Sequence, residues 1–180
     1  NLKEEKIRRV LKAAAEKFGW KPAKAPSGNG QGIACGIDAG TYVATVAEVR
    51  VDKQTGKVRV KRVVCAQDMG LVVNPEGATI QMEGCIMMGL GYSLSETIHF
   101  KGGEILDVNF DTYEIPRFSW MPKIETVIID NQGSDPQGGG EPAIVTMGAV
   151  IANAIYDAVG ARLFQLPMTP DRVKEAIKKS

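Results

Sequence analysis

A glycine-rich run that ends in a carboxylate, residues 138–142 (Gly-Gly-Gly-Glu-Pro), is the part of the sequence best suited to chemistry. An apolar stretch from Ala143 to Val159 follows it and predicts a buried helix, with Pro142 at the first helical position, where a missing N–H is tolerated. Glu141 would then stand at the N-terminus of this helix, where the dipole and unpaired N–H groups favour negative charge. Such an acid can be a general base, a neighbour of a bound anion, or a helix cap.

A second segment of unusual composition, residues 77–93, predicts a helix that contains Gly84, Gly89 and Gly91. Each interior glycine costs a helix about 1 kcal/mol relative to alanine. Three of them in one helix indicate that something approaches its backbone closely. That neighbour is either another helix or a ligand.

Composition excludes several kinds of site. The net charge of +1 gives no reason to expect nucleic acid as a partner. The three cysteines show no CxxC spacing and there is one histidine, so the chain does not supply the clustered ligands of a zinc or iron–sulfur site, and no metal ligand is expected. The longest apolar stretch is too short and too interrupted to span a bilayer, which takes about 20 residues, so no membrane insertion is predicted.

Other catalytic and nucleotide-binding patterns have weak support. Residues 28–32 (Gly-Asn-Gly-Gln-Gly) resemble a dinucleotide fingerprint only loosely, because they precede a strand instead of joining a strand to a helix. A serine–histidine–aspartate mechanism would need His99, which lies in a predicted strand and is better explained as a surface or packed side chain.

The pattern of helices and strands that must position these residues predicts an α+β fold. We expect antiparallel β-hairpins and packed helices in a single domain over residues 1–180. We expect helices at 3–18, 77–93, 143–159 and 170–178, and strands at 41–50, 58–66, 94–100, 104–110 and 123–130. Loops are expected at residues 21–32 and 131–140, and the second of these would be flexible enough to let a ligand touch the backbone.

Two segments, residues 81–92 (QMEGCIMMGLGY) and 139–142 (GGEP), together resemble the molybdenum hydroxylases of the xanthine dehydrogenase and aldehyde oxidase family. The flanking segments resemble the same family, at residues 42–49, 63–70, 73–75 and 122–125. The resemblance covers about residues 30–168 and is most similar to bacterial isoquinoline 1-oxidoreductases and aldehyde oxidoreductases. It implies that the chain is the C-terminal piece of a molybdopterin-binding subunit.

The resemblance also implies roles for five residues. Glu141 corresponds to the active-site glutamate of the family, the general base of a hydroxylation that takes its oxygen from water. Gln81 corresponds to a glutamine that hydrogen-bonds the cofactor, and Gly138, Gly139 and Gly140 would pass close to the metal. A base in this role needs a largely apolar, closed site, so we expect Glu141 to lie in one. The pterin coordinates the molybdenum in this family, so no protein ligand to the metal is expected.

The sequence departs from the family at three places. Met88 stands where the family often has a second glutamine, and Gly139 where it often has a basic or larger residue. Residues 29–32 replace an Arg-Gly pattern that is frequent before the first strand. The departure at Met88 concerns polar contacts at that position.

The remaining implications concern the whole protein. The cofactor would be molybdenum-molybdopterin, with or without a cytosine dinucleotide, and the substrates aldehydes or N-heterocycles. The partners would be the rest of the molybdopterin subunit and an iron–sulfur subunit whose clusters remove the electrons, so we expect this chain to be inactive alone. The cytoplasm is the expected compartment, with the periplasm as the alternative.

Two other interpretations of the same residues remain open. One is a non-catalytic pterin-binding or subunit-assembly module. The other is a generic anion-binding α+β domain, in which sulfate or phosphate would bind where residue 140 meets Glu141.

Overall fold

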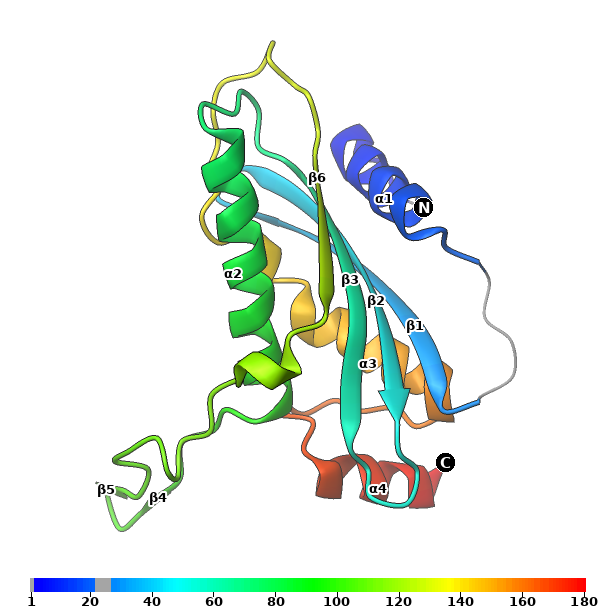
Figure 1. Ribbon diagram of the computed structural model, residues 1–180, viewed down its shortest axis with the longest axis vertical. Helices are drawn as coiled ribbons and strands as arrows, with labels where there is room; N and C mark the ends of the chain where they lie inside the picture. Colours follow the sequence, from blue (N-terminus) through cyan, green and yellow to red (C-terminus); the bar gives the residue numbers. More distant parts are fainter. Residues whose placement is uncertain (1, 22–26) are drawn as a thin grey trace.

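A computed structural model of the protein describes residues 2–21 and 27–180 (Figure 1). Its centre is a four-stranded sheet in the order β1-β2-β3-β6. The strands β1 (Asn29–Asp38), β2 (Thr41–Val51) and β3 (Val58–Asp68) are antiparallel neighbours, and β6 (Lys123–Ile128) runs parallel to β3. The mostly antiparallel sheet with packed helices confirms the predicted α+β class.

Helices cover both faces of this sheet. The amphipathic α1 (Glu5–Phe18) packs its apolar side, including Val10, on one face against Val64 of β3. The helices α2 (Pro75–Leu94) and α3 (Met147–Val159) cover the other face, where Ile151 packs in the same core as Val63. Adjacent β3 residues serve opposite cores because side chains alternate along a strand. The last helix, α4 (Pro170–Lys179), lies beyond one end of the sheet.

The first strand, β1, is absent from the predicted strands, and its residues 29–32 were expected to form a loop. The backbone of α3 lies directly on this glycine-rich part. A Cβ atom added to Gly30 would lie 2.2 Å from the carbonyl oxygen of Ala154, and one added to Gly32 would lie 2.0 Å from that of Val150. The glycine pattern that loosely resembled a dinucleotide fingerprint is therefore a packing feature.

The predicted strands at 94–100 and 104–110 are wrong in extent. α2 continues to Leu94, and the following arm contains only the two-residue strands β4 (Phe100–Lys101) and β5 (Glu104–Ile105). The arm, residues 96–118, projects away from the sheet and the helices (Figure 1). A two-stranded ribbon without a core is marginal in water, which explains why the pairing is so short.

The predicted helix at 143–159 begins later than expected. A 3₁₀ turn, η2 (Pro142–Ile144), comes first, and α3 starts at Met147. The segment Pro142–Val159 is long and apolar enough, by length and composition, to cross a membrane, and it is the one such segment in residues 2–21 and 27–180. Here it is divided between η2 and α3 and packs on β1 and β2, as a core helix does. The length of this segment therefore does not exclude that it spans a membrane, and the expected absence of membrane insertion stays a prediction.

Candidate functional site

The two motif segments, about sixty residues apart in the sequence, meet at one place on the surface. The amide nitrogen of Gln81, on α2, lies 3.6 Å from the position that a Cβ on Gly140 would take. One turn further along α2, the thiol of Cys85 donates a hydrogen bond to the carbonyl oxygen of Gly140, with 3.0 Å between the sulfur and the oxygen. Gln81 and Glu141 are both exposed on this side of the molecule.

The loop before Glu141 is held in place, contrary to the expectation of a flexible loop. Its backbone N–H groups donate from Gln137 to the carbonyl of Met69 (2.9 Å) and from Gly138 to the carbonyl of Ala39 (3.0 Å). The hydroxyl of Thr41 donates to the carbonyl of Gly138 at 2.6 Å. These bonds tie the loop to the β1–β2 turn and to the end of β3.

The three glycines of the motif have different surroundings. A Cβ on Gly138 would lie 2.5 Å from a side-chain carbon of the β1–β2 turn, and one on Gly139 would lie 2.8 Å from the sulfur of Met69. A Cβ on Gly140 would meet only the amide of Gln81, at an ordinary contact distance. Packing within this chain therefore explains the first two glycines, whereas Gly140 leaves a space open beside Gln81.

The carboxylate of Glu141 is neither a helix cap nor enclosed by this chain. It accepts no hydrogen bond from the η2 turn that follows, and its side chain is exposed. The expected closed, apolar surroundings are absent among the described residues of this chain, which leave Glu141 exposed. Burial, assisted by the nearby negative charge of Glu141, raises the pKa of the Cys85 thiol, which keeps it protonated as the donor to Gly140.

Two glycines of α2 differ in what lies against the backbone of the helix. A Cβ on Gly89 would lie 2.4 Å from a side chain of α3, so that glycine admits another helix. A Cβ on Gly84 would meet nothing within 4 Å. Gly84 lies on the exposed side of α2 with Gln81 and Met88, so this side is open to an external partner or ligand.

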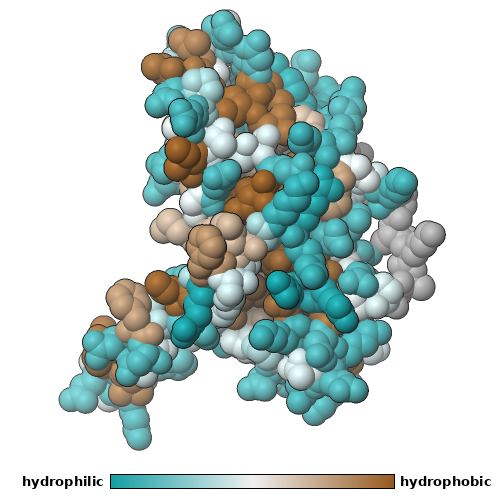
Figure 2. Space-filling model, viewed as in Figure 1, coloured by the Kyte–Doolittle hydropathy of each residue, from teal (hydrophilic) through white to brown (hydrophobic). Residues whose placement is uncertain are grey.

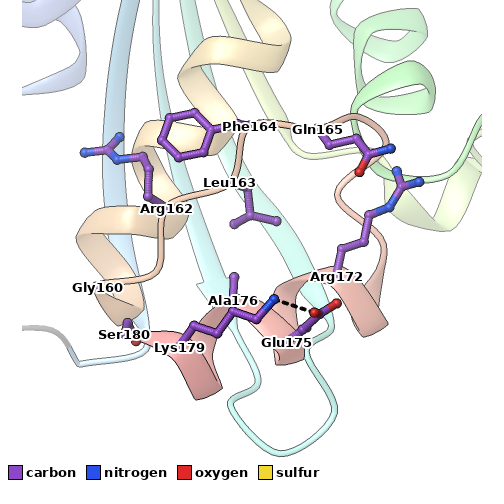
Figure 3. Close-up of a pocket in the computed structure, with 10 residues that line it drawn as sticks. All are labelled: Gly160, Arg162, Leu163, Phe164, Gln165, Arg172, Glu175, Ala176, Lys179 and Ser180. Carbon is purple, nitrogen blue, oxygen red and sulfur yellow. Dashed lines mark hydrogen bonds and ion pairs between the residues drawn. The ribbon is translucent and has the colours of Figure 1, made fainter.

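One pocket of the surface lies away from these residues. The pocket in Figure 3, about 430 Å³, is formed by residues 160–165 and α4, at the far end of the fold from η2. No three histidine, cysteine, aspartate or glutamate side chains gather as a metal site would need anywhere in the described part of the chain. Gln81, Gly140 and Glu141 are all exposed, so this chain presents them on an open surface.

Asp68 is a buried carboxylate at the end of β3 that sequence reasoning missed. It accepts hydrogen bonds from the guanidinium of Arg9 (2.8 Å), the side-chain amide of Asn131 (2.9 Å) and the N–H of Gly70 (3.3 Å). Asp68 thus joins α1 to the chain directly after β3 and to the start of the loop that leads to the motif. The available signal was an acidic residue shortly after the apolar run of residues 63–66 in this strand.

We expect Asp68→Ala to lower the free energy of unfolding by about 2–4 kcal/mol. The substitution leaves three donors, one of them charged, without their acceptor. Chemical denaturation measures the change. Asp130→Ala is the matched control, because this exposed acid has no hydrogen bond among the described residues and should change stability by less than about 0.5 kcal/mol. Equal effects of the two substitutions would contradict the anchoring role.

Comparisons with known proteins agree with the resemblance. Residues 5–122 match the family model described as a molybdopterin cofactor-binding domain, a range that includes Gln81 and ends before Gly138. The chain is 35% identical to a component of the nicotinate dehydrogenase of Pseudomonas putida, over 93% of this chain and 16% of that protein. It is 32% identical to the beta chain of the isoquinoline 1-oxidoreductase of Brevundimonas diminuta, over 89% of this chain and 21% of that protein.

A solved structure is similar to this chain in fold and in sequence. The aldehyde oxidoreductase from Desulfovibrio desulfuricans superposes with a TM-score of 0.66 at 31% identity, over 76% of this chain and 15% of that chain. The chain thus spans only about a sixth to a fifth of the length of these proteins.

Proposed function

Because this chain belongs to the molybdopterin cofactor-binding domain family, we propose that it forms one side of the cofactor site of a larger oxidoreductase. That enzyme would hydroxylate aldehydes or N-heterocycles with water as the oxygen source. The observation that carries the proposal is the meeting of Gln81, Gly140 and Glu141 on one exposed surface. The rest of the molybdopterin subunit would form the other side of the site, and an iron–sulfur subunit would remove the electrons. This chain, as a single domain over residues 1–180, would be inactive alone.

The residues present fit a pterin cofactor. The exposed amide of Gln81 offers both donors and acceptors, which suits a pterin edge or the phosphates of a dinucleotide form. A Cβ on Gly140 would occupy the space beside this amide, so the glycine keeps that space free for a ligand. Gly138 and Gly139 would act indirectly, by holding Gly140 in place. The bound group supplies the redox-active molybdenum.

Glu141 would be the general base. Its carboxylate makes no capping bond, so both oxygens are free to accept the proton of the water-derived oxygen that attacks the substrate carbon. The buried residues Pro142 and Ala143 fix the backbone directly after it. Closure of the site, which excludes water around this carboxylate, would come from the remainder of the protein.

The structure weakens one of the two alternatives. A generic anion site at residues 140–141 would depend on a helix N-terminus, but η2 has only three residues and α3 starts at Met147. A non-catalytic pterin-binding or assembly module would use Gln81 and Gly140 in the same way, without a role for Glu141. The cytoplasm as compartment, with the periplasm as the alternative, and a cytosine dinucleotide on the pterin rest on the resemblance alone.

The proposal predicts that Gly140→Ala in the full-length parent protein lowers the molybdenum and pterin content about tenfold or more. The new methyl group would occupy the space beside Gln81 and displace the cofactor, while it meets no other atom of this chain within 4 Å. The thermal unfolding midpoint of the apoprotein should therefore stay unchanged. Metal analysis and pterin release measure the first effect, and calorimetry measures the second.

Two further variants make this experiment selective. Gly133 lies in the same loop, and a Cβ added to it would meet no atom within 4 Å. The Gly133→Ala protein should therefore keep both its cofactor content and its stability. Gly138→Ala should destabilise the apoprotein itself, because its methyl group meets the β1–β2 turn at 2.5 Å. Full cofactor content in purified Gly140→Ala protein would contradict the proposed site.

A further inference from the structure

The arm formed by residues 96–118 has no core of its own. Large apolar side chains along it are exposed, among them Phe100, Ile105, Leu106, Val108, Phe110 and Phe118. The three phenylalanines are 75–86% exposed. Figure 2 shows apolar side chains on the arm, and others along the edge formed by α2, in the same view.

The arm nevertheless has a defined shape. At its base, the hydroxyl of Tyr113 donates to the carboxylate of Glu96 at 2.6 Å, and the hydroxyl of Ser95 donates to the carbonyl of Glu114 at 2.8 Å. Further out, Asp107 accepts from both the backbone N–H and the ring of His99. These bonds give the arm a fixed conformation in which its apolar side chains are exposed.

An exposed apolar surface of this size is typical of an interaction site. A fully buried aromatic side chain removes roughly 150–250 Å² from water, so the three phenylalanines alone would bury several hundred Å². Apolar patches larger than this are rare on monomeric proteins unless they bind a partner. Between Phe100 and Phe118 the charged side chains are mostly acidic, so the arm does not favour an anionic membrane or nucleic acid. The two basic ones are Lys101 and Arg117, and the four acidic ones are Glu104, Asp107, Asp111 and Glu114.

We propose that the arm docks onto an apolar surface in the remainder of the parent polypeptide and clamps that remainder against the cofactor side of this chain. This inference rests on the proposed function, in which the chain is one part of a longer molybdopterin subunit. The relatives contain about four-fifths or more of their length outside the matched part, so a partner surface is available within the same polypeptide. The arm continues from α2, whose exposed side bears Gln81, Gly84 and Met88, so one partner can cover both.

Limited trypsin digestion of the full-length parent protein tests the docking. Lys101 and Arg117 on the arm and Lys53 in the β2–β3 turn are all exposed in this chain. If the arm is docked, cleavage at Lys101 and Arg117 should be at least tenfold slower than at Lys53. Cleavage of the arm at the same rate as the turn would overturn the proposal.

Photo-crosslinking identifies the partner surface. A benzoyl-phenylalanine placed at Phe110 of the full-length protein should crosslink to a peptide outside residues 1–180 of the same polypeptide. The same residue placed at Gln54, in the exposed β2–β3 turn, is the control for non-specific reaction. A crosslink from position 110 between two copies, detected as a doubled mass, would overturn the proposal, as would no crosslink above the control.

A double variant separates this inference from the proposed cofactor site. Phe110→Ser with Phe118→Ser should lower molybdenum content at least threefold and restore tryptic cleavage at Lys101, since both side chains contribute to docking and not to the fold of this chain. If the double variant keeps its content and resists trypsin while Gly140→Ala still loses cofactor, the arm proposal fails and the cofactor site stands. Full content in Gly140→Ala would instead contradict the cofactor site.

Discussion

Glu141→Gln in the full-length parent protein, with molybdenum and pterin fully loaded, is expected to lower turnover by about 10²–10⁴-fold, the usual contribution of a general base. The amide has nearly the shape of the carboxylate but cannot accept the proton. Glu141 is exposed and makes no capping bond, so the substitution removes no contact that stabilises this chain. Stability and cofactor content should therefore stay unchanged while turnover falls.

The assay follows dye reduction with a panel of aldehydes and N-heterocycles. Glu83→Gln is the matched control, because Glu83 is an exposed glutamate on α2 near Gln81, and the proposal gives it no role. That control should keep turnover within about twofold. Unchanged turnover in fully loaded Glu141→Gln protein would remove the base from the mechanism and favour the non-catalytic pterin-binding or assembly module.

Local pattern was enough to predict the elements with strong periodicity. The alternation in β2 and β3, joined by a short polar turn, gave the hairpin, and the spacing of Ile7, Val10, Ala14 and Phe18 gave α1. Long-range contacts decided the rest. β6 pairs with β3 across a connection of more than fifty residues, and no local signal predicts a parallel partner at that distance. The alternation predicted at 104–110 produced almost no strand, because the arm has no neighbouring layer to pack on.

The candidate site was predictable only through the family resemblance. Nothing in the composition of residues 81–92 predicts that Gln81 meets Gly140, because the tertiary packing of α2 beside η2 brings them together. The expected enclosure of Glu141 concerns the complete site and stays a prediction, because this chain alone leaves the carboxylate exposed. Cys85 was missed since its role depends on a carbonyl more than fifty residues away, which no sequence spacing reveals.

Gly32→Ala is expected to lower the free energy of unfolding by about 3 kcal/mol or more, although Gly32 lies far from the motif in sequence. The added Cβ would lie 2.0 Å from the carbonyl oxygen of Val150 and 2.6 Å from the amide nitrogen of Ala154. Both atoms belong to the backbone of α3, so no side chain can rotate away, and the helix must move off β1. Chemical denaturation measures the loss, with Gly133→Ala, which has open space around it, as the control.

The same displacement should reach the candidate site. α3 follows η2 after two residues, and η2 follows Glu141 directly, so a shift of α3 moves the backbone that positions the carboxylate. Surviving Gly32→Ala protein should therefore turn over more slowly even when its cofactor content is restored. An unchanged free energy of unfolding would show that α3 does not press on β1, and the positioning of Glu141 through η2 and α3 would lose its support. Gly32 would then serve the strand alone.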